Sequence, residues 1–310
     1  MSTVDCIAAT VLSLLLAVSP VSAAPLPPPT PSPTSSPVAL RFDGPIKPFK
    51  DDLFSRETVL ESADRGAYKV IDYQEMRDIN GRDAVPERHV KDQYMALGVR
   101  REQANQTLPF SSGRLDVGRV GPEKGATVTV IFIHGRGGDR RLGLNDYMFG
   151  GNFNRLKNLL VQSGGTYYSP SVKSFDDAGM AAVGDLIRYS FEQSSGGPVI
   201  LACASMGGYI CQGAARNGEL SRYLKGMVYL GGPPDKDIAK TAFGKLKLPI
   251  YFAHGSSDIV YKWEDQAAVY RKLKAQKYPV MFTLFKTGTH GTPIRMVDWR
   301  EALNFILSTR

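Results

Sequence analysis

Three side chains of this sequence, Ser205, Asp258 and His290, are of the types that together form a nucleophilic catalytic group. A serine hydroxyl is a weak nucleophile unless a neighbouring base takes its proton. An imidazole acts as that base when a carboxylate fixes its tautomer and stabilises its charged form. Each residue lies in a short segment of small residues: ASMGG, HGSSD and TGTHG. Their types and chain order predict a covalent catalytic site formed by loops.

The segment around Ser205 differs in one position from the nucleophile-elbow pattern G-x-S-x-G. Gly207 fills the last position, but Cys203 stands where the pattern has its first glycine. In such an elbow, a strand turns sharply into a helix and holds the serine hydroxyl clear of the backbone. Cysteine is smaller than any branched apolar residue, so we interpret Cys203 as a tolerated replacement and Ser205 as the nucleophile.

The elements that must position these residues alternate between strand and helix. Apolar, β-branched runs predict strands, and amphipathic spacing predicts helices. The predicted strands are 67–74, 113–121, 126–133, 165–171, 198–204, 226–232, 248–253 and 278–285, and the predicted helices are 152–164, 174–193, 206–216, 263–276 and 296–307. This alternation predicts a mostly parallel central sheet with helices on both faces, and ligands bind at the carboxyl ends of such strands.

Four glycine-containing segments follow predicted strands: HGRGG, ASMGG, HGSSD and TGTHG. These segments and the chain order Ser205, Asp258, His290 resemble those of the α/β-hydrolase fold. The resemblance covers roughly residues 115–310. The resemblance implies a serine hydrolase without metal or organic cofactor. Residues 231–248 leave room for one short helix, so we expect a small cap domain or none.

The resemblance also implies a role for each histidine and acid near the predicted site. His290 would be the general base and acid, and Asp258 would orient it. His134 and His254, which precede glycines at strand ends, are expected in the loop framework. The further candidates are His89 as base and Asp235 or Asp237 as acid.

An oxyanion hole needs two N–H donors directed at the tetrahedral oxygen. By resemblance, we expect the backbone N–H of Met206 and that of Arg136, with Gly137 in reserve. A nucleotide site is not favoured here, because G-x-G-x-x-G would need glycine where Arg140 stands.

The segment GRGGDRR also concentrates the cationic side chains of Arg136, Arg140 and Arg141 near the predicted site. We expect Gly137, Arg140 and Arg141 to contribute to substrate binding, where guanidinium groups could recognise a carboxylate or phosphate. The alternative is a solvated loop. The net charge of +8 also fits an anionic ligand, but no nucleic-acid recognition motif accompanies it.

The beginning of the chain has features of an exported protein. The apolar run 7–18 and the small residues VSA at 21–23 predict a signal peptide over 1–23, followed by a proline-rich linker over 24–39. Residues 40–112 are an N-terminal extension with the first strands, and 113–310 form the predicted core. We therefore expect a secreted or periplasmic protein with no stable membrane anchor after cleavage. Cys203 and Cys211 are expected as two small buried thiols, although an oxidising compartment leaves a disulfide open.

The function expected from these residues is cleavage of a small-molecule or lipid ester through an acyl intermediate on Ser205. Acyl transfer, thioester cleavage and amide cleavage could use the same three residues. A non-catalytic binding protein on the same scaffold, or a cell-surface interaction protein, is the alternative of a different class.

Overall fold

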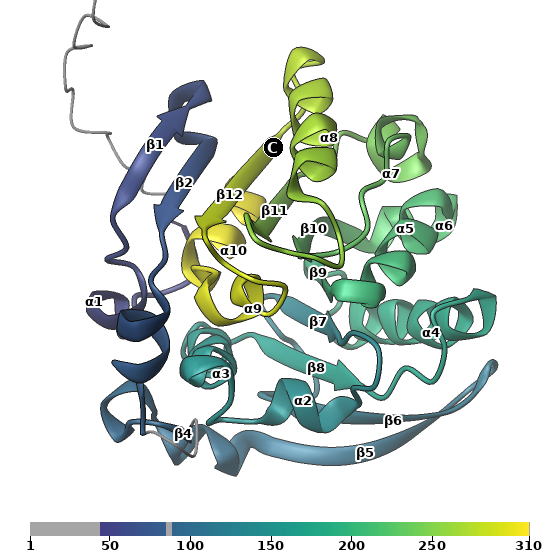
Figure 1. Cartoon of the computed structure of the whole chain (residues 1–310). Coiled ribbons are helices and arrows are strands. Elements are labelled where there is room, and N and C mark those ends of the chain that lie inside the picture. Colours follow the sequence, from purple (N-terminus) through teal and green to yellow (C-terminus); the bar gives the residue numbers. More distant parts are fainter. Residues whose placement is uncertain (1–43, 85–88, 310) are drawn as a thin grey trace, which may run out of the picture. The chain divides into compact units, whose positions relative to one another are not determined.

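The computed structural model describes residues 44–84 and 89–309 (Figure 1). All of them belong to one compact unit, Pro37–Arg310. The predicted signal peptide, 1–23, and the proline-rich linker, 24–39, lie outside the described residues.

One ten-stranded sheet forms the centre of the described structure, in the order β1-β2-β12-β11-β10-β9-β7-β8-β6-β5 (Figure 1). The strands are β1 Val59–Ala63, β2 Tyr68–Asp72, β5 Gln103–Phe110, β6 Gly113–Val120, β7 Thr129–Ile133, β8 Thr166–Pro170, β9 Val199–Ala204, β10 Leu224–Leu230, β11 Ile250–Gly255 and β12 Val280–Lys286. The strands from β2 to β8 in this order run parallel, while β1, β6 and β5 pair antiparallel at the two edges. Strands β3 Asp83–Ala84 and β4 His89–Val90 form a separate pair.

Helices cover both faces of the sheet (Figure 1). The helices are α1 Asp51–Phe54, α2 Arg140–Leu144, α3 Asn152–Gln162, α4 Asp177–Gln193, α5 Gly208–Arg216, α6 Gly218–Tyr223, α7 Ala242–Lys245, α8 Trp263–Ala275, α9 Thr292–Met296 and α10 Trp299–Ser308. Short helical turns complete the chain: η1 Asp64–Gly66, η2 Met76–Asn80, η3 Asp92–Tyr94, η4 Leu97–Glu102, η5 Phe149–Gly151, η6 Ser205–Gly207 and η7 Ile238–Lys240. Helices α4, α5 and α8 pack on one face, and α2, α3, α9 and α10 pack on the other.

The pleat of the central strands explains why both faces are covered. Side chains alternate between faces along a strand, and every residue of β7 and β9 is buried. Ile131 and Leu201 belong to one hydrophobic core, and Val130 and Ile200 to the other. Strands that are apolar on both sides need helices on both sides, so the predicted fold class is confirmed.

The polar segment before residue 113 supplies both edges of the sheet. Strand β2, predicted as 67–74, pairs with β12, and β5, which the sequence did not predict, forms a hairpin with β6. Because β5 alternates intermediate and exposed side chains, its apolar signal is weak. The helix predicted at 174–193 begins at Asp177, with Asp176 as its N-cap in place of Ser174.

The connection between β10 and β11 contains only η7 and α7. Neither is long enough to form a covering domain. The expectation of a small cap or none is therefore confirmed, and the carboxyl end of β9 has no cap inserted at this point of the chain.

Candidate functional site

The turn from β9 into α5 holds Ser205 in a left-handed backbone conformation, with φ of 51°. Such a conformation is unfavourable for a residue with a side chain, so the surrounding packing must impose it. A Cβ on Gly207 would lie 2.7 Å from the carbonyl oxygens of Ile133 and His134. A Cβ on Gly208 would lie 2.7 Å from Pro233. The absence of side chains at both positions therefore permits the close crossing that the elbow requires.

Ser205, His290 and Asp258 lie in one hydrogen-bonded series. The hydroxyl oxygen of Ser205 is 2.8 Å from Nε2 of His290, and Nδ1 of His290 is 2.8 Å from Oδ2 of Asp258. Since a carboxylate only accepts, Nδ1 carries the proton and Nε2 is free to accept from the serine hydroxyl. The Asp258 side chain is fully buried, whereas that of His290 is 28 % exposed. The geometry leaves the serine and the imidazole accessible and their carboxylate partner shielded.

Asp258 accepts hydrogen bonds on both carboxylate oxygens. Oδ1 accepts from the backbone N–H groups of Val260 and Tyr261, and Oδ2 faces His254 as well as His290. Burial by itself would raise the pKa of Asp258, but the hydrogen bonds from His254 and His290 outweigh it and hold the pKa well below its ordinary value. The carboxyl is therefore ionised at neutral pH.

His254 has a direct contact with Asp258 that the sequence did not predict. Its Nε2 lies 3.3 Å from Oδ2 of Asp258 and 2.9 Å from the carbonyl oxygen of Tyr261. Both neighbours are acceptors, so Nε2 carries the proton. Among the described residues, Nδ1 of His254 has no partner. The HG dipeptide before the acid loop was the available sequence signal, and it indicated a framework role only.

His134 has a fixed tautomer of the opposite kind. Its Nε2 accepts from the N–H of Val172, and its Nδ1 lies 2.8 Å from the carbonyl oxygen of Gly135. Burial lowers the pKa of His134, so the imidazole is neutral. It joins the loops after β7 and β8 and does not contact Ser205, Asp258 or His290 through any recorded hydrogen bond.

The loop after β7 approaches Ser205 closely. A Cβ on Gly135 would lie 2.8 Å from Cβ of Ser205, so Arg136, the next residue in the loop, also lies near Ser205. Within the described part of the chain, the backbone N–H groups of Arg136 and Gly137 donate to no protein acceptor. Met206 is the second residue of η6, where N–H groups lack partners within the helix.

A cavity of about 500 Å³ lies beside this loop. It is lined by His134, Arg136, Gly137, Gly138, Asp139, Ser171, Val172, Lys173, Phe175 and Met206. Its walls come from the loops after β7 and β8, which are adjacent parallel strands. The cavity thus joins both predicted oxyanion donors to residues 171–175, which lie about 35 positions after Arg136 and about as far before Met206.

Arg140 and Arg141 lie outside the lining of this cavity. Nε of Arg141 is 2.8 Å from Oδ2 of Asp139, and Nε of Arg140 is 3.3 Å from Oδ1 of Asn105. Their role in substrate binding stays a prediction. Lys173 and Phe175, which sequence analysis did not single out, line the cavity instead, because pairing of β7 with β8 brings their loop alongside.

Cys203 and Cys211 form a disulfide, so the expectation of two free thiols is wrong. Both residues are fully buried. The bond joins the end of β9 to α5 across Ser205. At the first elbow position, the cysteine therefore ties the strand to the helix, which a glycine could not do.

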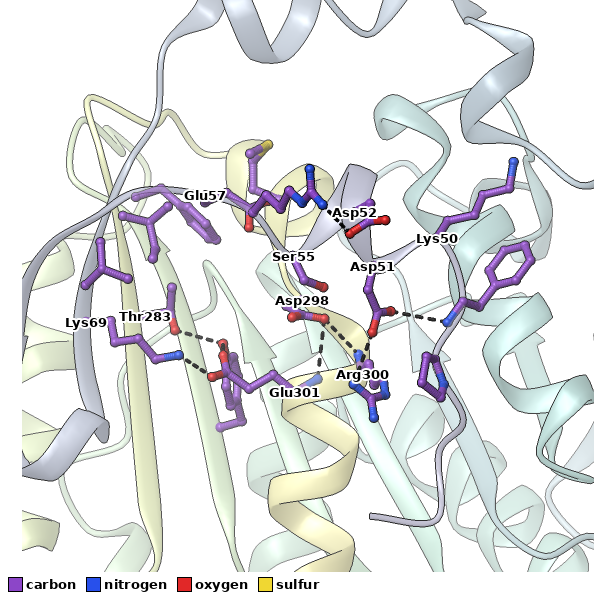
Figure 2. A pocket seen from close by; sticks show the side chains of 18 residues that line it. Lys50, Asp51, Asp52, Ser55, Glu57, Lys69, Thr283, Asp298, Arg300 and Glu301 are labelled. Atoms are coloured by element: carbon purple, nitrogen blue, oxygen red, sulfur yellow. Dashed lines mark hydrogen bonds and ion pairs between the residues drawn. The ribbon is translucent and has the colours of Figure 1, made fainter. Parts of the chain in front are cut away.

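A second cavity, of about 750 Å³, lies between α1, β1, β2, β12 and the start of α10 (Figure 2). Figure 2 shows its charged side chains paired with one another: Lys69 contacts Glu301, and Arg300 contacts Asp51. Burial raises the pKa of Glu57, which also lines it, to about 7, although Arg82 opposes this shift. None of Ser205, Asp258 and His290 lines this cavity.

Two kinds of feature are absent from the described part of the chain. Residues 44–84 and 89–309 contain no group of three or more metal-binding side chains. No helix in these ranges is long and apolar enough to cross a membrane.

Comparison with known proteins gives matches among solved structures only. No protein-family model matches the sequence, and no curated protein matches it. A thermostable esterase superposes with a TM-score of 0.53 at 16 % identity, over 68 % of this chain and 64 % of its own. A protein of unknown function from Agrobacterium tumefaciens, a candidate alpha/beta hydrolase, superposes with a TM-score of 0.51 at 16 % identity, over 66 % of this chain and 95 % of its own. The chain has the α/β-hydrolase fold.

A lidless a/b serine hydrolase from Xanthomonas campestris is also similar, with a TM-score of 0.49 at 20 % identity, over 67 % of this chain and 94 % of its own. At these identities the likeness concerns the α/β-hydrolase fold and not the reaction. The chemistry must be argued from the site of this chain.

Proposed function

We propose that this protein is a serine hydrolase that cleaves carboxylic esters through an acyl intermediate on Ser205. The observation that carries the proposal is the unbroken series from Oγ of Ser205 through His290 to Asp258, with 2.8 Å at each contact. The accessible serine, the Nε2 atom facing its hydroxyl and the shielded carboxylate are what nucleophilic acyl transfer requires.

In the first half of the reaction, Nε2 of His290 takes the proton from the Ser205 hydroxyl while Oγ bonds to the ester carbonyl carbon. The carbonyl oxygen becomes an oxyanion, for which the N–H groups of Met206 and Arg136 are the proposed donors. Collapse of this intermediate breaks the bond to the alcohol oxygen, which receives the proton from His290. The acyl group remains on Ser205.

In the second half, a water molecule gives one proton to Nε2 of His290 while its oxygen bonds to the acyl carbon. The bond from carbon to Oγ then breaks, and the proton returns to Ser205. Asp258 stabilises the imidazolium in both halves without taking its proton. The low pKa of Asp258 is suited to this role.

Among the possible acyl donors we propose an ester, since esterases are among the proteins that share this fold. We also propose that the protein is exported, because a buried disulfide beside the nucleophile persists best in an oxidising compartment.

The test is covalent labelling with a fluorophosphonate, followed by hydrolysis of short p-nitrophenyl esters. We expect the wild-type protein to be labelled once and to turn over the esters. Ser205→Ala should lose both properties, whereas Ser308→Ala, at the exposed end of α10, should retain them. A folded wild-type protein that is neither labelled nor active would refute the proposal.

A further inference from the structure

The cavity beside Ser205 contains two cationic side chains without partners. Arg136 and Lys173 line it; both residues are exposed, and within residues 44–84 and 89–309 neither side chain has a hydrogen bond or ion pair to a protein group. The one carboxylate of the lining, Asp139, is held by the guanidinium of Arg141, whose hydrogen bonds lower the pKa of Asp139. The cavity therefore has an excess of positive charge.

The remaining walls are uncharged. Val172, Phe175 and Met206 are apolar, and the ring of Phe175 meets that of His134 edge-on, with centroids 5.9 Å apart. The hydrogen bonds of His134 fix it as a neutral imidazole. Asp176, which follows Phe175 in the chain, caps α4 and accepts from Ser174, so its carboxylate is already engaged. An apolar cavity with two unpaired cations matches a short hydrocarbon chain that ends in an anion.

The direction of the reaction decides which part of an ester reaches this cavity. His290 must protonate the leaving alcohol, so that part of the ester faces His290. Neither His290 nor its neighbours line the cavity, whereas Met206 and Arg136 do. The acyl chain, attached to the carbon whose oxygen faces Met206 and Arg136, is the part that can enter.

We propose that the preferred substrates are esters whose acyl chain ends in a carboxylate, recognised by Arg136 and Lys173. This inference rests on the ester hydrolysis proposed above and names its substrate class. A cavity of about 500 Å³ accommodates a short dicarboxylic half-ester. Arg136 and Lys173 come together only because β7 and β8 are neighbours, so neither the spacing nor the local sequence reveals the pair.

The test compares p-nitrophenyl hydrogen adipate with p-nitrophenyl hexanoate, which has the same chain length without the charge. The measured quantity is the ratio of the two kcat/KM values, corrected for spontaneous hydrolysis. We expect the ratio to favour the anionic ester and to fall with added salt. Lys173→Glu should lower the ratio about fivefold, because a favourable ion pair becomes a repulsive one.

The matched control is Lys124→Glu, an exposed lysine in the loop that precedes β7, at the end of that strand away from Ser205. It changes the net charge equally and should leave the ratio unchanged. A third arm uses 4-acetoxybenzoate against its methyl ester, which places the charge on the alcohol side. A preference there that Lys173→Glu abolishes would overturn the assignment to the acyl chain.

The two proposals fail in different ways. If neutral esters are hydrolysed but the wild-type ratio shows no preference, or Lys173→Glu and Lys124→Glu behave alike, the substrate class is wrong and the hydrolase remains. If the protein hydrolyses neither ester and is not labelled by a fluorophosphonate, both proposals are overturned.

Discussion

The imidazole of His254 lies against the same carboxylate oxygen of Asp258 that faces His290. His254 Nε2 lies 3.3 Å from Oδ2, and His290 Nδ1 lies 2.8 Å from it. One carboxylate oxygen thus contacts two histidines: His254, which is fully buried, and His290, which faces Ser205. His254 is a positioning residue in this arrangement, since it acts on His290 through Asp258.

The first prediction concerns the pH dependence that His254 imposes. His254→Leu removes the polar N–H group that lies against Oδ2 of Asp258, so the carboxylate should stabilise the imidazolium of His290 more strongly. We expect the midpoint of the acid limb of the kcat/KM profile to shift to higher pH, by about half a unit to one unit. His254→Gln, which retains an N–H donor, should move it less. Equal losses of kcat in both variants with no movement of the limb would show that His254 only fills space.

The second prediction concerns the disulfide around the nucleophile. Replacing Cys203 and Cys211 together by alanine should lower the free energy of unfolding by about 2–3 kcal/mol, because the closed loop no longer restricts the unfolded chain. We expect kcat to fall as well, since the bond joins the two elements on either side of Ser205. Urea unfolding and ester hydrolysis, each with and without a dithiol reductant, provide the measurements.

The control for this experiment is the double variant itself. Reductant should lower the free energy of unfolding of the wild-type protein and leave that of the double variant unchanged. If reductant has no effect on the denatured and refolded wild-type protein, the two cysteines are not bonded in solution.

The third prediction concerns the close crossing behind Ser205. Gly207→Ala would place a methyl group 2.7 Å from the carbonyl oxygens of Ile133 and His134. Backbone atoms cannot rotate away, so we expect a loss of about 2–3 kcal/mol and a large fall in kcat. Gly218→Ala is the control, because its methyl group would meet only Cβ of Ala242 at 3.9 Å. An active Gly207→Ala protein of unchanged stability would contradict the elbow.

The fourth prediction concerns Glu57 in the cavity of Figure 2. Burial raises its pKa to about 7 in the folded protein, against about 4.3 in an unfolded chain. Between these values the unfolded state has lost the proton that the folded state keeps, so stability falls as pH rises. The fall amounts to on the order of 3–4 kcal/mol, since each unit of pKa difference corresponds to about 1.4 kcal/mol.

Glu57→Gln removes this titration. As pH rises from about 4.3 to about 7, the free energy of unfolding should fall less in the variant than in the wild-type protein. The measurement is the free energy of unfolding in urea across this range. Glu61→Gln, an exposed position on β1, should follow the wild-type curve. Parallel curves for the wild-type protein and Glu57→Gln would show that Glu57 titrates normally.

The sequence by itself determined the elements with strong apolar signals and the order of the residues at their ends. Strands β7, β9 and β11 are buried on both sides, so their residues are mostly apolar and easily recognised. Parallel strands bring their carboxyl ends to one edge of the sheet. This is why the positions of Ser205, Asp258 and His290 in the chain were enough to predict that they lie together.

Only the tertiary structure decided the contacts between residues that no local pattern relates. The edge strand β5 has little apolar signal because one of its sides faces solvent. The bond between Cys203 and Cys211 depends on how α5 crosses β9. The contact between His254 and Asp258 depends on how the acid loop folds back on His254. Arg136 and Lys173 meet because β7 pairs with β8, since strand pairing brings together residues that are distant in the chain.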